Sequence, residues 1–449
     1  MLSSLGSKKT RLNIFSAVAS TLTLVSVSSV GCPDLGKFYQ LLDEAPASAA
    51  EQLMPYLEEC SQSSEYFALL GASQLAVGNL LQALENLELA LLIDPGNGSA
   101  SVDYAEVLFS QGQILSALEI NEQLLARGDL PEGLRESLVA RQRRWGRSTI
   151  QTSFSAAGFL GFDNNLNSAP VSDQLSLTLS GNSVTLDVSP EYQATEGGYT
   201  RLVGSANMSR IGQSINSQLS GQLRGRFSQD SRYELVQAST QGIFSQARDN
   251  PAWDGVIGFD HVVFGGNAIF SSATLRARYL VKQTESCDFY PRVAVQYQYF
   301  NSQRSLSGVE HGLGLGADCR FLAANQYNRV AFEMTAIVNE ATENNRLGAD
   351  RNGWRLNLLW RRSLGRGEFL GQFVQTRLDD QAGYSALFQR GAKRKETLNS
   401  LFFQYMRPLR GLNSAAQFFS NLSYYSQDST IDLFKTRGTS LEVGINWNF

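Results

Sequence analysis

Strand-like alternation of apolar and polar residues runs from about residue 148 to the last residue of this chain. The final segment is the clearest case, because apolar side chains occupy every second position: Leu441, Val443, Ile445, Trp447 and Phe449. A period of two is the repeat of a β-strand with one apolar and one polar face. Most of the chain is therefore predicted to form one large antiparallel sheet.

The alternation divides into about fourteen segments, a number and pattern typical of single-chain bacterial membrane barrels. They start near residues 149, 195, 215, 232, 252, 267, 288, 309, 327, 352, 366, 396, 414 and 438. Each is long enough for the roughly 9–11 residues that a tilted strand needs to cross the hydrocarbon layer. A soluble sandwich also alternates, but so many long aromatic faces would lack an opposing sheet. The sequence predicts a transmembrane antiparallel β-barrel over residues 147–449.

The connections between these segments predict the orientation of the barrel. Long connections follow the odd-numbered strands, at 161–198, 339–353, 379–396 and 426–438, whereas "RIGQS", "LAANQ" and "SLGRGE" follow even-numbered ones. Bacterial barrels have long loops outside and short turns in the periplasm. The first strand is therefore expected to run outward from a periplasmic N-terminal domain, with the barrel in the outer membrane of a Gram-negative cell.

A second pattern, with a period of 34 residues, precedes the strands. Gly78 and Ala83 have counterparts at Gly112 and Ala117, and this period is similar to that of the tetratricopeptide repeat (TPR) family. Residues 32–146 are therefore predicted to form a short all-α solenoid, which gives an α+β fold in two domains. The expected helix pairs are a degenerate one at 33–60, the best match at 64–95 and a weaker one at 98–129, followed by a closing helix at 131–145. Such arrays bind a peptide or partner protein; the alternative is a spacer without a ligand.

The first 31 residues have the organisation of a secretory signal peptide. "KKTR" at 8–11 is followed by the apolar and small-residue run 12–31 and then by Cys32. "SSVGC" also resembles a bacterial lipobox, with Ser29 where leucine is usual, so lipidation of Cys32 is an alternative. Outside this segment no run approaches the roughly 18 apolar residues of a transmembrane helix.

Four cysteines form two candidate disulfides. Cys287 and Cys319 come opposite each other if their hairpin is centred on Gln303, and a slip of one residue would place them on different faces. A periplasmic location is oxidising, which favours this bridge. Cys32 and Cys60 could form a second bridge across the first helices, unless Cys32 is lipidated.

Arginine gathers on the polar, hence lumen-facing, side of the predicted strands. The positions are Arg224, Arg226, Arg276, Arg278, Arg292, Arg355 and Arg361. Seven cations on an interior wall would favour anionic cargo. Alternatively, they pair with acidic residues such as Glu333 and Glu442 and brace the lumen. The sequence leaves both interpretations open.

No catalytic, cofactor or metal site is predicted, and a net charge of -4 gives no indication of nucleic-acid binding. His261 and His311 are far apart and belong to no cluster with metal-ligand spacing. The pair Asp379 and Asp380 falls in an expected external loop, where hydration would account for both charges. The chain is accordingly not expected to be an enzyme.

The order of signal peptide, TPR domain and barrel resembles the surface lipoprotein assembly modulator (Slam) family of outer-membrane proteins. "GFDNNLNSAPVSD" (161–173) and "DDQAGYSALFQRGAKRK" (379–395) look like segments of that family and its TPR-barrel relatives. The resemblance implies a translocation factor whose repeats receive a client lipoprotein and whose barrel assists its passage to the surface. Export of exopolysaccharide and a porin with an accessory domain are the alternatives.

The last segment also resembles the C-terminal signal recognised by the bacterial barrel-assembly machinery. In that signal a final aromatic residue follows apolar residues at alternating positions, as in Leu441, Val443, Ile445, Trp447 and Phe449. The assembly machinery, outer-membrane lipid and a client or periplasmic partner protein are thus the expected partners. This strand is also expected to pair with the first one, near 149–159, so that no strand edge faces lipid.

Overall fold

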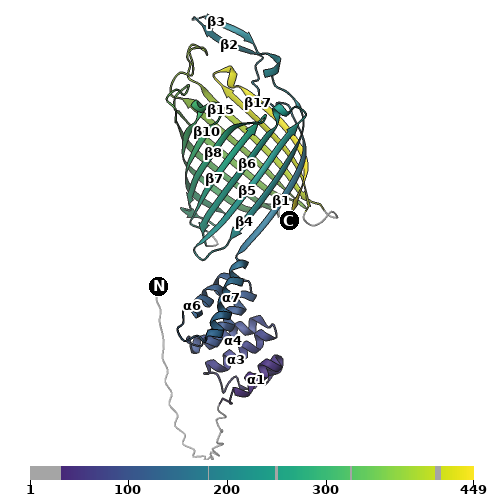
Figure 1. The fold of residues 1–449 in the computed structure, drawn as a ribbon, viewed down its shortest axis with the longest axis vertical. Helices are drawn as coiled ribbons and strands as arrows, with labels where there is room; N and C mark the ends of the chain where they lie inside the picture. The colour runs from purple at the N-terminus through teal and green to yellow at the C-terminus, as the bar shows by residue number, and fades with distance from the viewer. Residues whose placement is uncertain (1–31, 181, 248–250, 324–325, 410–415) are drawn as a thin grey trace, which may run out of the picture. The chain divides into compact units, whose positions relative to one another are not determined.

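The computed structural model describes residues 32–180, 182–247, 251–323, 326–409 and 416–449. The signal peptide expected at 1–31 lies outside these described residues. The chain divides into two compact units, one ending at Gln142 and one running from Arg143 to Phe449. The first is helical and the second is a barrel of strands (Figure 1), so the predicted two-domain α+β fold is confirmed.

The helical unit begins with three antiparallel helix pairs. The helices are α1 (Gly36–Glu44), α2 (Pro46–Leu53), α3 (Ser64–Ala76), α4 (Leu80–Ile93), α5 (Gly98–Ser110), α6 (Ile114–Leu125) and α7 (Glu132–Ser148), with a 3₁₀ turn η1 (Met54–Tyr56) after α2. Ser63 and Asn97 cap α3 and α5 by accepting hydrogen bonds from the N–H groups of Tyr66 and Ala100. None of the helices in the described part of the chain is long and apolar enough to span a membrane.

Small and apolar side chains form the core between the helices. Ala83 and Ala90 of α4 are fully buried, which lets α3 and α4 approach closely, and Tyr66 of α3 is buried beside them. The Tyr66 hydroxyl donates to the Leu53 carbonyl at 2.9 Å and so ties α3 to α2. A disulfide between Cys32 and Cys60 fastens the start of the described chain to the segment after η1.

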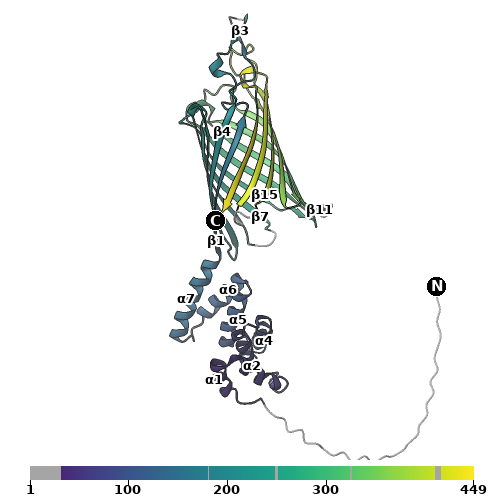
Figure 2. The same cartoon turned by 90° about the vertical axis from the view of Figure 1, so that its right-hand side faces the viewer.

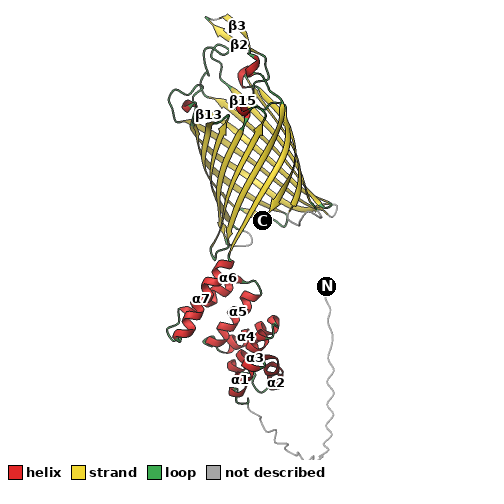
Figure 3. Ribbon diagram, turned by 45° about the vertical axis from the view of Figure 1, so that its right-hand side comes forward, coloured by secondary structure: helices red, strands yellow, loops and turns green. Residues whose placement is uncertain are grey.

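The barrel contains fourteen long antiparallel strands among the described residues. They are β1 (Ile150–Asp163), β4 (Gly197–Arg210), β5 (Ile215–Ser228), β6 (Leu235–Gln246), β7 (Trp253–Phe264), β8 (Asn267–Tyr279), β10 (Cys287–Phe300), β11 (Gly308–Ala323), β12 (Gln326–Ala341), β13 (Arg351–Leu364), β14 (Gly367–Asp380), β15 (Lys395–Pro408), β16 (Ala416–Ser429) and β17 (Thr436–Asn448). Each pairs with the next in this list, and β17 pairs with β1. Figure 3 shows the strands of this wall in yellow. The sheet is therefore closed.

The closed wall has an apolar outer face and a mostly polar inner face. Leu223, Leu275, Leu313 and Leu441 are each more than half exposed although they are apolar. The residues beside them on the same strands point the other way, into the barrel. In an aqueous setting such an outer surface would be unfavourable, whereas lipid hydrocarbon accommodates it. The fold therefore points to an outer-membrane barrel.

The two ends of the barrel differ in their connections. At the end where β1 starts, which we call the turn end, short segments such as 211–214 and 365–366 join the strands. At the opposite loop end lie the connection 164–196, which carries the hairpin β2 (Gln174–Leu179) and β3 (Asn182–Asp187), and the segment 381–394. Figure 2 shows these loops gathered at one end of the tilted strands. The sequence did not predict the hairpin.

The seam between β1 and β17 is held by more than backbone pairing. Glu442 of β17 accepts hydrogen bonds from the Tyr199 hydroxyl at 2.8 Å and from Arg201 Nε at 2.8 Å, and both donors belong to β4. Asn421 of β16 donates to the same carboxylate at 3.0 Å. Gly161 of β1 lies between, and a side chain there would collide with the Tyr199 ring. One carboxylate therefore links β16, β17 and β4 across β1.

We expect Glu442→Ala to destabilise the barrel, because the Arg201 guanidinium would stay on the inner wall without its counterion. Removing one partner of such a sheltered pair costs about 3 kcal/mol or more. The measurement is the temperature at which the purified protein changes from folded to unfolded mobility in gel electrophoresis. Glu340→Ala is the matched control, because that carboxylate is exposed and only approaches His311 at 3.7 Å. Equal transition temperatures for the two variants would contradict the role of Glu442.

A second expectation concerns Phe449, whose backbone N–H donates to the Phe154 carbonyl at 2.8 Å and whose carbonyl accepts from the Phe154 N–H at 3.3 Å. Its side chain is 76% exposed on the apolar outer side. Phe449→Asp should lower the amount of folded barrel in outer-membrane fractions, because it places a charge on the outer face of the closing strand. The control is Asn448→Asp, on the inner face. Unchanged assembly of Phe449→Asp would count against the predicted assembly signal.

Candidate functional sites in the barrel and the helical unit

All seven arginines predicted to face the lumen lie at inward positions of the barrel wall. Arg224 follows Leu223 and Arg276 follows Leu275, and both leucines are 58% exposed on the outer face. The same alternation along β5, β8, β10 and β13 turns Arg226, Arg278, Arg292, Arg355 and Arg361 inward. The barrel interior is therefore a candidate site for charged ligands, provided that its cations are available.

Five of the seven arginines already have a carboxylate partner. Arg226 pairs with Asp163 at 3.2 Å, Arg355 with Glu310 at 3.1 Å and Arg361 with Glu368 at 2.8 Å. Arg278 pairs with Asp254, and Arg292 pairs with Glu333. These pairs agree with the bracing interpretation, including the partner Glu333. The other carboxylate expected in a ladder, Glu442, is instead bound by Arg201, which sequence reasoning missed.

The Arg292 pair shows how the wall permits such braces. Arg292 is on β10 and Glu333 is on β12, so the contact spans β11. In the strand register, Arg292 lies opposite Gly314 and Glu333 lies opposite Gly316, both on the inner face of β11. Because glycine has no side chain, the long arginine can lie across β11. The Gly-Leu repeat of β11 was the available sequence signal for this arrangement.

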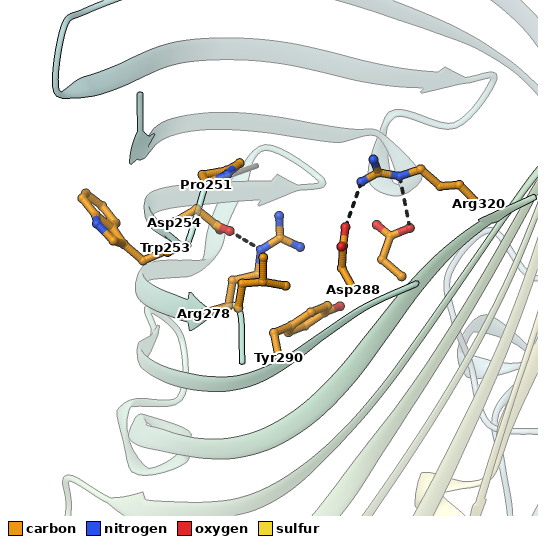
Figure 4. A pocket seen from close by; sticks show the side chains of 10 residues that line it. Pro251, Trp253, Asp254, Arg278, Asp288, Tyr290 and Arg320 are labelled. Carbon is orange, nitrogen blue, oxygen red and sulfur yellow. Dashed lines mark hydrogen bonds and ion pairs between the residues drawn. The ribbon is translucent and has the colours of Figure 1, made fainter. Parts of the chain in front are cut away.

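A small cavity of about 130 Å³ near the turn end is enclosed by further ion pairs (Figure 4). Arg320 reaches Asp288 at 3.5 Å and Asp318 at 3.9 Å, while Arg278 pairs with Asp254. The Tyr290 ring lies 5.1 Å from the Arg278 guanidinium, which adds a cation–π contact. Each charged side chain that lines this cavity has an opposite charge beside it. The ion pairs therefore connect neighbouring strands and leave no uncompensated charge for a ligand.

The Cys287–Cys319 disulfide lies next to this cavity, on paired residues of β10 and β11. The two cysteines are directly opposite in the register, which is the pairing given by a hairpin centred on Gln303. The second predicted bridge, Cys32–Cys60, is also formed in this structure. A lipid attached through the Cys32 sulfur would exclude it, because the same sulfur cannot form both bonds. The described residues contain no free cysteine.

The Asn-rich segment at 161–173 fixes the first long loop over the loop end. The Asn165 amide donates to the carbonyls of Ala169 at 3.0 Å and Arg437 at 2.9 Å, and its oxygen accepts from the Ala169 N–H. Asn167 donates to the Gln193 carbonyl at 2.8 Å. The loop backbone groups thus form hydrogen bonds with asparagine side chains instead of with a neighbouring strand. The segment therefore has a structural role, which is to hold the loop in place.

Asp380 corrects the expectation that the pair 379–380 is simply hydrated. Its side chain is fully buried and pairs with Arg351 and Arg394, each at 3.2 Å. The Arg394 guanidinium also makes cation–π contacts with the rings of Tyr384 and Phe434, at 4.7 and 4.8 Å. The sequence placed this acidic pair in a loop, but β14 continues to Asp380 and turns it inward. The segment 381–394 is thereby fastened to the loop end.

In the helical unit, Asn121 anchors α7. It is fully buried, donates to the Leu138 carbonyl at 3.1 Å and accepts from Arg141 Nε at 2.8 Å. Arg141 also donates to the Val102 carbonyl at 3.0 Å and approaches Glu106 at 3.7 Å. Asn121 departs from the repeat pattern, and its amide supplies the hydrogen bonds that hold the helix following the repeats.

Asp103 of α5 is partly buried beside this network. Burial raises its pKa from 3.8 to about 6, against the lowering effect of Arg141, and nearby Glu106 raises it further. Among the described residues, no group of three or more histidine, cysteine and acidic side chains is arranged to hold a metal ion. The two histidines stay apart, with His261 Nδ1 at 2.9 Å from the Ser271 hydroxyl and His311 beside Glu340.

Comparison with known proteins identifies the repeat. A tetratricopeptide-repeat family profile matches residues 74–136, and a search of curated proteins found no match. The solved TPR domain of Sgt2 from Aspergillus fumigatus is 20% identical, with 27% of this chain and 85% of that chain covered and a TM-score of 0.24. The helical unit thus carries tetratricopeptide repeats, which generally mediate protein–protein interaction.

Two solved barrels also match the chain. One is described as a bacterial polysaccharide outer membrane secretin, with 12% identity, 66% of this chain and 98% of that chain covered, and a TM-score of 0.34. The other is an anion-selective porin from Comamonas acidovorans, with 10% identity, coverage of 67% and 99%, and a TM-score of 0.32. These scores are too low to support an argument, so the barrel assignment rests on its own closed strand pairing. The chain thus combines a tetratricopeptide-repeat unit with a closed barrel of strands.

We expect Asp103→Asn to stabilise the helical unit near neutral pH. The folded-state pKa of about 6 exceeds the unfolded value of 3.8, so the protonated carboxyl favours folding. Its contribution is complete below the unfolded pKa and is lost as the pH rises through about 6. The substitution should therefore add about 1 to 3 kcal/mol at about pH 7.5 and nothing at about pH 3.5.

The measurement is urea unfolding of the helical unit in the full chain, followed by far-ultraviolet circular dichroism while the barrel stays folded. Asp129→Asn is the control with the opposite sign, because Arg127 lowers the pKa of that exposed carboxyl. Parallel pH profiles for wild type and Asp103→Asn would show that Asp103 does not carry the effect.

Proposed function

We propose that this protein is an outer-membrane translocation factor that delivers a client lipoprotein to the cell surface. The repeats dock the client or a periplasmic partner, and the barrel forms the membrane unit. The observation that carries the proposal is a matched protein-interaction repeat at 74–136 in the same chain as a closed barrel. A simple diffusion pore has no use for such a repeat. The proposed role includes no catalytic step.

The proposed orientation follows from chain connectivity. α7 ends at Ser148, and β1 begins at Ile150, at the turn end. Long loops face outward in bacterial barrels and short turns face the periplasm. In this orientation the helical unit is in the periplasm, where a secreted client would arrive, and the chain enters the membrane at the start of β1.

The helical unit offers exposed apolar side chains for docking. Leu81 is 67% exposed and Leu92 is 79% exposed on α4. Eleven positions apart on a helix, the two side chains lie on one face, and Glu85 and Glu88 lie exposed between them. A face that combines leucine with carboxylates suits an apolar segment with basic flanks.

Protease shaving of intact cells tests this proposal. We expect at least one lipoprotein to lose its surface exposure in cells that lack this protein, and in cells whose copy carries Leu81→Glu and Leu92→Glu, because charge on α4 would block apolar docking. Peptides released by the protease are identified by mass spectrometry.

The matched control carries Leu179→Glu and Leu186→Glu, which change two exposed leucines in the β2–β3 hairpin. Its lipoprotein exposure should equal that of wild type. If no lipoprotein changes its exposure in cells without the protein, the proposed function is wrong. If exposure is lost in cells without the protein but not in cells with the α4 variant, the client docks elsewhere on the chain.

A further inference from the structure

Two inward-facing arginines lack the counterion that their neighbours have. Among the described residues, no carboxylate oxygen forms an ion pair within 4.0 Å of the guanidinium nitrogens of Arg224 or Arg276. Arg224 donates to the amide oxygen of Gln222 at 2.8 Å, which is a neutral partner. A guanidinium without a counterion on a sheltered wall attracts an anion strongly.

Both arginines line one cavity of about 580 Å³ on the inner wall between β4 and β8. The wall between them is built from hydroxyl and amide side chains, including Ser239, Gln241 and Thr274. A single carboxylate, Asp260, belongs to the same lining, and Gln237 donates to it at 3.3 Å. Two guanidinium groups against one carboxylate leave the cavity with a net positive charge.

The adjacent cavity shows that this positive charge is local. That cavity, of about 570 Å³, is also lined by Arg201 and Arg226, but Glu442 and Asp163 neutralise those two. Arg224 lines both cavities, as do Ser205 and Gln222. Of the seven predicted arginines, the two without a carboxylate partner thus lie on the wall from β5 to β8, and the other five are paired.

We infer that this wall binds an elongated acidic saccharide, with carboxylate groups on Arg224 and Arg276 and hydroxyl groups on the polar side chains between them. β5 and β8 are three strand spacings apart, roughly 14 Å across the sheet, so one carboxylate does not reach both arginines. Asp260 of β7 lies between these two strands and accepts hydrogen bonds from sugar hydroxyls. None of the described residues that line this cavity is aromatic, which disfavours a stacked nucleic acid.

This inference goes beyond the proposed docking role and is tested without it. The full-length protein in detergent is titrated calorimetrically with trigalacturonate. We expect saturable binding that weakens about tenfold or more in Arg224→Gln/Arg276→Gln, because two charged hydrogen-bond donors are lost. The matched control is Arg361→Gln, which removes an inward arginine that already pairs with Glu368. It should bind as wild type does.

Two further ligands, measured on the wild-type protein alone, distinguish the contribution of the carboxylates from that of the hydroxyl groups. Maltotriose has the hydroxyl groups but no carboxylates, and it should bind at least about tenfold more weakly than trigalacturonate. Acetate has the carboxylate alone, and it should not displace trigalacturonate at equal carboxylate concentration. Equal binding of maltotriose, full displacement by acetate, or an unaffected double variant would each overturn the inference. Folded mobility in gel electrophoresis verifies each variant, and the ligand comparison stands even if the double variant misfolds.

Discussion

Pairing of β1 with β17 is the constraint on which the remaining structure depends. In lipid, an unpaired strand edge would leave backbone N–H and C=O groups without partners, at a cost of several kcal/mol for each group. Closure removes that edge and defines an inside and an outside. In the closed sheet, alternate residues such as Leu441 and Glu442 face different environments, lipid outside and the barrel interior inside. The Glu442 network with Tyr199 and Arg201 secures the seam where the chain's first and last strands meet.

Closure also explains why the interior is so rich in ion pairs. Inward side chains of a barrel face one another and a confined volume of water, so an unpaired charge there is less well hydrated than at an open surface. Long arginines cross neighbouring strands to reach carboxylates, and inner glycines such as Gly161 and Gly316 leave room for the side chains that lie over them. Against this background the unpaired Arg224 and Arg276 stand out, since bracing does not account for them.

In the helical unit, too, a residue that departs from the sequence pattern has a specific structural role. Repeat positions that hold small residues, such as Ala83 and Ala90, serve close packing of two helices. Asn121 departs from that pattern because it has another task, the anchoring of α7 through Leu138 and Arg141. A departure from a repeat pattern therefore marked a contact with the next element along the chain.

The sequence by itself determined the two-domain layout and the strand number, and it predicted an inward face for seven arginines, because a period of two and a period of 34 residues depend on local geometry alone. Strand starts lie within a few residues of their expected positions; the expected 232 against the observed Leu235 is among the larger differences. Only the tertiary structure decided which arginines are braced, that Asp380 is buried with Arg394, and that Arg201 rather than a predicted arginine holds Glu442. These contacts join strands and loops distant in sequence, and they depend on the shear of the closed sheet, which no local pattern encodes.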